Sequence, residues 1–237
     1  MKKLIISHGD KGGVGKSVIA TTCTEALLAA GQLVALVEGD PSQPDVGARY
    51  TRDPGVKLGA LPLARAGAPE AAVADLSYWL ETDAAEADAV VINLPAGASE
   101  TLDGLGGAIR EVADALGYEI FVTYSLGKGE APARGLGKSL KGGLLSHVDP
   151  DKRLVLFPLF QGHQATFAWY RDPARAAKNF HEAAFPELSP VAVFNKFLAG
   201  KGRWEEIKGA GGLMVYDKIA IGRWLDAATA ALAPVLS

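Results

Sequence analysis

The stretch Gly9-Asp10-Lys11-Gly12-Gly13-Val14-Gly15-Lys16-Ser17 holds the residues best suited to chemistry in this sequence. Its glycines let backbone N–H groups point into a concavity and let a phosphate approach closely. Lys16 would reach the β- and γ-phosphates of a nucleotide, the Ser17 hydroxyl would sit on Mg²⁺, and a helix starting after Gly15 would add partial positive charge. We therefore expect a phosphate-binding loop whose nucleotide contacts come from Gly12, Gly13, Val14, Gly15, Lys16, Ser17 and Val18.

Two further polar positions follow short apolar runs. Asp40 lies in Glu38-Gly39-Asp40-Pro41, and Asn93 follows Val90-Val91-Ile92. Phosphoryl transfer depends mainly on positioning water and offsetting charge, so a carboxylate such as Asp40 could serve it. Asn93 could accept a hydrogen bond from a metal-bound water, although an amide brings no negative charge. Each residue could instead be an ordinary turn residue at the end of a strand.

The elements that must position these residues alternate along the chain. Apolar runs rich in Val, Ile and Leu, without polar alternation, suit strands covered on both faces of a parallel sheet. The expected strands are Lys3–Ser7, Leu33–Glu38, Ala89–Asn93, Glu119–Tyr124, Arg153–Pro158 and Pro190–Phe194. The expected helices are Ser17–Ala30, Glu70–Leu80, Glu100–Leu116, Ala131–Ser146, Pro173–Phe185 and a last one from about Asp217 to Ala233. This order predicts an α/β fold with one doubly wound, mostly parallel sheet and helices on both faces.

The rest of the chain shows no internal repeat and no convincing boundary, so residues 1–237 are expected to form one domain. Thr51–Pro69 and Lys196–Gly212 are interpreted as surface excursions. Gly135-Leu136-Gly137-Lys138-Ser139 looks like a second phosphate loop. It follows Pro132 and Arg134 instead of a strand, so we expect part of a solvated helix.

Composition excludes several classes of protein. The 237 residues are 49% hydrophobic and 22% charged with a net charge of −3, so any contact with DNA would need a local basic patch. Such a patch could lie in Lys128–Arg153, which carries six basic residues (Lys128, Arg134, Lys138, Lys141, Lys152, Arg153) against three acidic ones, although a solvated face is the alternative. The single cysteine, Cys23, excludes an internal disulfide framework. With no run of eighteen apolar residues, we expect a cytoplasmic protein without membrane insertion.

The missing first glycine and the added lysine in KGGVGKS resemble the deviant Walker A motif of the ParA/MinD family of P-loop ATPases. The resemblance implies a P-loop NTPase fold, ATP and Mg²⁺ as cofactors, and a sandwich homodimer that forms with ATP. By motif position, Lys11 would reach the phosphates held by the partner subunit, and Lys16 those of its own subunit. Asp40 matches the second aspartate of the family's D-x-D-P, which orients the attacking water and supports the metal. Glu38 replaces the first aspartate, and Asn93 replaces the aspartate at the end of the next strand, which implies slow hydrolysis.

The phosphate loop, the variant strand-end loop and the tail LMVYDKIAIGRWLDAATAAL are also similar to the TraL and StbC-type proteins of conjugative or mobilisable plasmids. The resemblance implies an ATP-dependent dimerisation switch in plasmid mobilisation, transfer or partition, acting through a protein partner or DNA. In this family the base is commonly contacted where Gln161-Gly162-His163 stands. A nucleotide-binding scaffold with negligible hydrolysis, and a metabolic or metallochaperone P-loop enzyme, stay open as alternatives.

Overall fold

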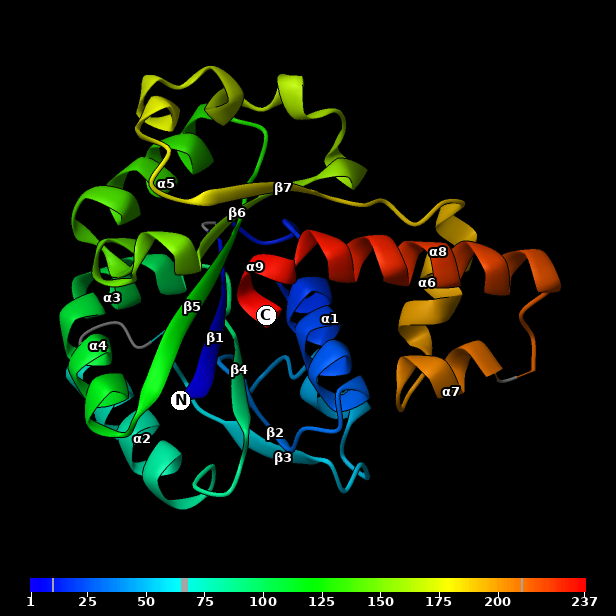
Figure 1. Ribbon diagram of the computed structural model, residues 1–237, viewed down its shortest axis with the longest axis horizontal. Coiled ribbons are helices and arrows are strands. Elements are labelled where there is room, and N and C mark those ends of the chain that lie inside the picture. Colours follow the sequence, from blue (N-terminus) through cyan, green and yellow to red (C-terminus); the bar gives the residue numbers. More distant parts are fainter. Residues whose placement is uncertain (10, 65–67, 210) are drawn as a thin grey trace.

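The computed structural model describes residues 1–9, 11–64, 68–209 and 211–237. Within these residues, seven strands form one sheet in which every neighbouring pair is parallel, in the order β3-β2-β4-β1-β5-β6-β7 (Figure 1). The strands are β1 Lys2–His8, β2 Val34–Glu38, β3 Val56–Ala60, β4 Ala89–Asn93, β5 Tyr118–Ser125, β6 Arg153–Pro158 and β7 His181–Phe185. The predicted α/β fold with one parallel sheet is confirmed.

Helices cover both faces of this sheet. One apolar core holds Leu4 and Ile6 of β1 together with side chains from the helices α2 to α5, and the other holds Ile5 together with side chains from α1 and from the helices after β7. Because alternate strand residues enter different cores, the central strands are apolar over most of their length. The helices are α1 Lys16–Ala29, α2 Pro69–Thr82, α3 Ala98–Gly104, α4 Gly106–Ala115, α5 Glu130–Gly142, α6 Val191–Ala199, α7 Trp204–Gly209, α8 Val215–Ala231 and α9 Ala233–Leu236.

The region between β6 and α6 differs from the sequence-based expectation. Pro173–Phe185 is not a helix: a short 3-10 turn over Pro173–Ala177 is followed by β7. β7 lies at the edge of the sheet beside β6 and leaves His181 and Glu182 exposed, so HEAAF lacks the continuous apolar run of a central strand. The predicted strand Pro190–Phe194 is wrong too, because helix α6 begins at Val191. A five-residue apolar run fits either element, and only packing decides between them.

Smaller differences concern loops and breaks. Thr51–Pro69 contains the strand β3, and Lys196–Gly212 contains the end of α6 and all of α7, so neither is only a surface excursion. The expected helix Glu100–Leu116 is two helices, α3 and α4, which meet at Leu105. Gly135–Ser139 lies inside α5, as expected for a helix and not for a second phosphate loop.

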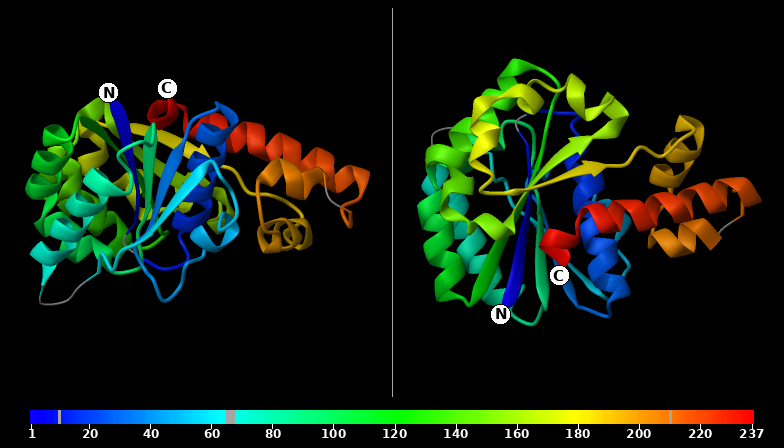
Figure 2. Two further views of the ribbon diagram at one scale, coloured as in Figure 1. Left: turned by 90° about the horizontal axis from the view of Figure 1, so that it is seen from below. Right: turned by 45° about the horizontal axis from the view of Figure 1, so that its top comes forward.

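The helices α6 and α7 and the first half of α8 form a projection that we call the arm (residues 191–209 and 211–224). All views show it extending to one side of the sheet (Figures 1 and 2). It packs around the aromatic side chains of Phe197, Trp204 and Trp224, with the Trp204 and Trp224 rings 5.3 Å apart between centroids. The Arg203 guanidinium makes a two-pronged ion pair with Asp53, at 2.6 and 2.8 Å, which joins the arm to the loop before β3. No helix among the described residues is long and apolar enough to cross a membrane.

Candidate functional site

The phosphate loop joins the end of β1 to the start of α1, with its backbone anchored from below. The Ser7 hydroxyl donates to the Lys16 carbonyl oxygen at 2.9 Å, and the Ser125 hydroxyl of β5 donates to the Val14 carbonyl oxygen at 2.6 Å. Gly15 precedes the helix with φ 94°, and an added Cβ there would lie 3.1 Å from the Phe160 ring. The positive φ at position 15 therefore favours glycine, and a side chain there would also crowd the Phe160 ring. Asp10, the departure from the usual loop, lies outside the described residues.

The two lysines of the loop are placed differently. Lys16 is buried, and its ammonium donates to the Lys11 carbonyl oxygen at 2.7 Å, so the side chain folds back over the loop. Lys11 is exposed and does not line the cavity beside the loop. Val14 does not line it either, because its side chain is buried beneath the loop near Gly9 and Gly127.

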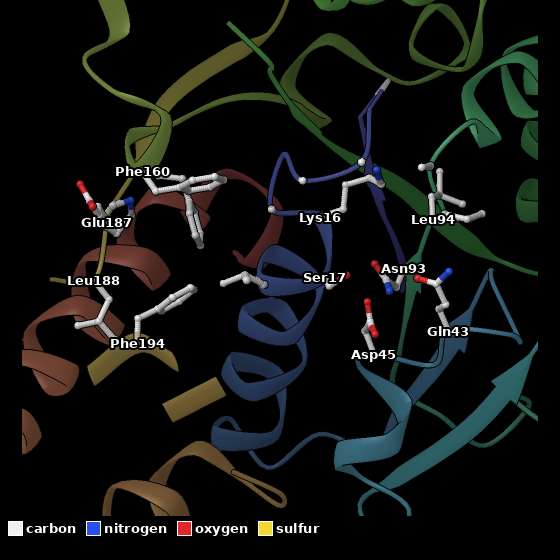
Figure 3. A pocket seen from close by; sticks show the side chains of 18 of the residues that line it. Lys16, Ser17, Gln43, Asp45, Asn93, Leu94, Phe160, Glu187, Leu188 and Phe194 are labelled. Atoms are coloured by element: carbon white, nitrogen blue, oxygen red, sulfur yellow. The ribbon is translucent and has the colours of Figure 1, made fainter. Parts of the chain in front are cut away.

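A cavity of about 470 Å³ opens at the amino-terminal end of α1 (Figure 3). One wall brings together most of the sequence-predicted site residues, namely Gly12, Gly13, Gly15, Lys16, Ser17, Val18, Asp40 and Asn93. In Figure 3, Ser17 and Asn93 face the same space below Lys16. Polar groups from three strand ends thus meet at one edge of the sheet, where ligands of open α/β sheets bind.

The opposite wall of the cavity was missed from the sequence. It is largely apolar and consists of Phe160, Phe185, Pro186, Glu187, Leu188, Val191, Phe194 and Trp224. The Trp224 indole donates to the Pro186 carbonyl oxygen at 3.0 Å, which joins α8 to this wall. Gln161 and His163, expected near a base, do not line the cavity, whereas the neighbouring Phe160 does. The sequence indicates the rest of the apolar wall only through Phe185-Pro186-Glu187 at the end of a strand. That indication is lost when the residues of β7 are predicted to be helical.

Asp40 lies at the rim of the cavity in a turn of its own loop. Its carboxylate accepts hydrogen bonds from the Ser42 backbone N–H at 3.0 Å and from the Ser42 hydroxyl at 2.6 Å. These hydrogen bonds hold the pKa of the Asp40 carboxyl below its ordinary value, so the group is ionised at neutral pH. A water-orienting Asp40 would have to use its second oxygen or leave Ser42.

Glu38 and Asn93 face each other at the ends of β2 and β4, where the strand register pairs them. The Asn93 amide nitrogen donates to the Glu38 carboxylate at 2.9 Å, and both side chains are buried. Burial raises the pKa of the Glu38 carboxyl, and its hydrogen bonds with Asn93, Gly47 and Val46 offset part of that rise. In the part of the chain that the structure describes, the Asn93 side-chain oxygen has no hydrogen-bond partner.

The donor set suits a magnesium ion that arrives with a nucleotide. Among the described residues, no three His, Cys, Asp or Glu side chains gather closely enough to hold a metal ion by themselves. Mg²⁺ in nucleotide sites usually takes one or two protein ligands and fills its shell with phosphate oxygens and waters. The Ser17 hydroxyl and the Asp40 carboxylate could supply those ligands, and the unpartnered Asn93 oxygen could accept from a bound water.

Fewer basic side chains of Lys128–Arg153 are available at the surface than the sequence alone suggests. Lys152 is paired with Glu119 and Asp149, and Arg153 is buried and donates to the Val148 carbonyl oxygen. These two residues are therefore not available to a polyanion. The exposed basic residues that remain are Lys128, Arg134, Lys138 and Lys141, three of which lie on α5.

No family model matches the chain, and no curated protein is significantly similar to it in sequence. Solved structures are similar in fold. Apo McdA from Cyanthece has a TM-score of 0.58 at 13% identity, covering 98% of this chain and all of that one. The septum site-determining protein MinD with Mg-ADP from Pyrococcus horikoshii has a TM-score of 0.53 at 16% identity, covering 93% of this chain and 95% of that one.

A protein from Borrelia burgdorferi assigned to plasmid partition, bound to AMPPNP, has a TM-score of 0.50 at 15% identity. The alignment covers 94% of this chain and 98% of that one. At these identities the likeness establishes a shared fold.

Proposed function

We propose that this chain is an ATP-binding, slowly hydrolysing dimerisation switch of the ParA/MinD type. The observation that supports it most is the phosphate loop, which opens on a cavity shared with Asp40 and Asn93. Neighbours in fold bind Mg-ADP or AMPPNP in their structures, which supports a nucleotide with Mg²⁺ as the ligand. Within that family we propose a role in plasmid mobilisation, conjugative transfer or partition, in the manner of TraL and StbC-type proteins.

The two walls of the cavity bind different parts of the nucleotide. Backbone N–H groups of Gly13 and Gly15 and the ammonium of Lys16 neutralise the phosphates, and the release of Lys16 from the Lys11 carbonyl accompanies their entry. The apolar wall at Phe160 and Pro186 receives the planar base and excludes water from it. Mg²⁺, when bound, offsets the phosphate charge and lowers the barrier to phosphoryl transfer. Asp40 holds a water near the terminal phosphate.

The dimer is the part of the proposal that Lys11 supports. Because Lys11 is exposed and outside the cavity of its own subunit, its ammonium is free to reach a nucleotide across an interface. The test is light scattering of the wild type with ATP and Mg²⁺ and with ADP, in which only ATP should produce dimers. Lys11→Ala should still gain thermal stability from ATP but stay monomeric. Equal dimerisation of this variant would make Lys11 a surface lysine only.

A scaffold that binds ATP without hydrolysing it is the second candidate, favoured by the engagement of Asp40 with Ser42 and by the uncharged Asn93. Steady-state phosphate release separates the two. In a slow ATPase, Asp40→Ala should bind ATP, accumulate dimers and lose turnover, since a misplaced group costs about a hundredfold in rate. Turnover at the background level in the wild type would favour the scaffold, and full turnover in Asp40→Ala would contradict the role of Asp40.

The partner is proposed to be a protein, with DNA as a further partner through the exposed basic residues of α5. Arg134, Lys138 and Lys141 recur at helical spacing, so their side chains share one side of the helix. Contacts of this kind with phosphates depend on salt because binding releases counterions. Retention on DNA that falls steeply with salt in the wild type, and not in Lys138→Ala with Lys141→Ala, would support this partner.

A further inference from the structure

We propose that Glu38 is a positioning residue: it holds the Asn93 amide so that the side-chain oxygen of Asn93 faces the magnesium side of the cavity. The inference rests on the proposed function and concerns how this chain manages without an acidic residue at position 93. The acidic member of this pair is Glu38, on the neighbouring strand, and Glu38 itself does not line the cavity.

The first step is the rigidity of Glu38. Its Oε1 accepts from the Val46 backbone N–H at 2.6 Å and also from the Gly47 N–H, while Oε2 accepts from the Asn93 amide. A Cβ at Gly47 would lie 3.1 Å from the Glu38 Cγ, so a side chain there would crowd the carboxylate. Three N–H donors and a close backbone thus leave the buried carboxylate one arrangement.

The second step is the orientation of Asn93. The Asn93 amide nitrogen donates to Glu38 Oε2 at 2.9 Å, so the Asn93 side chain turns its NH₂ toward Glu38. The Asn93 oxygen is then directed away from Glu38, and Asn93 lines the cavity together with Ser17 and Asp40. That oxygen is buried, on a side chain only 6% exposed, and it lacks a partner within the described residues.

The third step is what this oxygen can do. A buried acceptor without a partner carries a desolvation cost unless a ligand donates a hydrogen bond to it. A water molecule bound to Mg²⁺ is a strong donor and could supply that hydrogen bond. The hydrogen bond to Glu38 polarises the Asn93 amide, so the Asn93 oxygen carries more negative charge than that of an isolated amide. Outer groups of this kind orient the ligands nearer a metal, and their loss typically lowers metal affinity about 10- to 100-fold.

The decisive variant is Glu38→Gln, which keeps shape but reverses the hydrogen bond. The new amide can accept from Val46 and Gly47 and donate to the Asn93 oxygen, so the Asn93 NH₂ turns toward the cavity. The folded protein should be about as thermally stable as the wild type, because the new amide can make the same number of hydrogen bonds. Mg²⁺ should then tighten ATP binding about tenfold less than in the wild type, measured by calorimetry with and without Mg²⁺.

A second variant keeps the test decisive if Glu38→Gln folds poorly. Glu38→Gln combined with Asn93→Asp exchanges the amide and the carboxylate, and should restore the effect of Mg²⁺ on ATP binding. Asn93→Asp alone places two carboxylates at hydrogen-bond distance and should lower the melting temperature. Glu86→Gln changes an exposed residue and is the control, which should leave the melting temperature unchanged.

An unchanged effect of Mg²⁺ in Glu38→Gln, or a double variant as weak as Glu38→Gln, would overturn the positioning role. Failure of the wild type itself to bind ATP would instead overturn the proposed function, so the two failures are distinguishable.

Discussion

The two walls of the cavity come from different parts of the chain and are built on different principles. The polar wall comes from residues 12–96, and backbone hydrogen bonds hold it, such as those from Ser7 to Lys16 and from Ser125 to Val14. The apolar wall comes from residues 160–224 and is held by aromatic packing behind Trp224. Polar chemistry tolerates few residue types at each position, whereas an apolar wall can be built by many. The polar wall can therefore be recognised as a sequence motif, whereas the apolar wall cannot.

The largest expected effect is on stability and comes from disrupting the aromatic packing behind the apolar wall. Trp204 is almost fully buried against Phe197 and Trp224, and truncation of a buried Trp costs about 3–5 kcal/mol. Trp204→Ala should lose that much unfolding free energy in urea denaturation, and Trp204→Phe clearly less. Nucleotide affinity of the folded fraction should fall only modestly, because the phosphate loop lies outside the arm. Complete loss of ATP binding by folded Trp204→Ala would show that the two walls are not separable.

The next effect tests the polar wall. ATP at about 100 times its dissociation constant should stabilise the wild type by about 2.7 kcal/mol. Lys16→Ala should lose most of that gain, because it removes the charge that faces the phosphates, while unfolding without nucleotide should change little. Thermal shifts with and without ATP provide the measurement. Lys138→Ala, in the GLGKS stretch of α5, is the matched control and should respond to ATP like the wild type. A normal response of Lys16→Ala would end the phosphate-loop interpretation.

A smaller effect should distinguish the base from the phosphates. Phe160 contacts the space above Gly15, and an aromatic contact contributes about 1 kcal/mol, or roughly fivefold in affinity. Phe160→Ala should weaken ATP and ADP equally and leave the binding of inorganic triphosphate unchanged, as measured by calorimetry. His163→Ala, three residues on, should alter none of the three. Equal weakening of triphosphate would place Phe160 on the phosphate side.

The smallest effect concerns the tie between the arm and the sheet. The hydrogen bonds from Arg203 hold the pKa of the Asp53 carboxyl below its ordinary 3.8, so the stabilisation is present above that pH and is lost as the pH falls through the folded-state value. Arg203→Ala should cost about 1 kcal/mol or less in urea at neutral pH, and the difference from the wild type should vanish in strong acid. Lys57→Ala, which breaks the exposed pair with Asp83, should change little at either pH. A difference that persists in acid would assign the effect of Arg203 to packing.

The pattern of success along the chain has a physical cause. The strands β1, β2, β4, β5 and β6 were predictable because each is covered on both faces and carries a continuous apolar run. The edge strand β7 and the helix α6 were not, since one is half exposed and the other too short to show a period. The apolar wall of the cavity, which these two elements help to form, could therefore not be predicted either.

By itself, the sequence determined the parallel sheet, through its continuous apolar runs, and the position of the glycine-rich loop before α1, because closely spaced glycines act through local backbone geometry. Only the tertiary structure decided that Glu38 meets Asn93, 55 positions away, and that Phe160 covers Gly15. Both contacts depend on strand order: β2 must lie beside β4, and β6 must place its following loop over the start of α1. Strand order follows from which helices best cover the two cores, and that is a property of the packed whole and not of any short stretch.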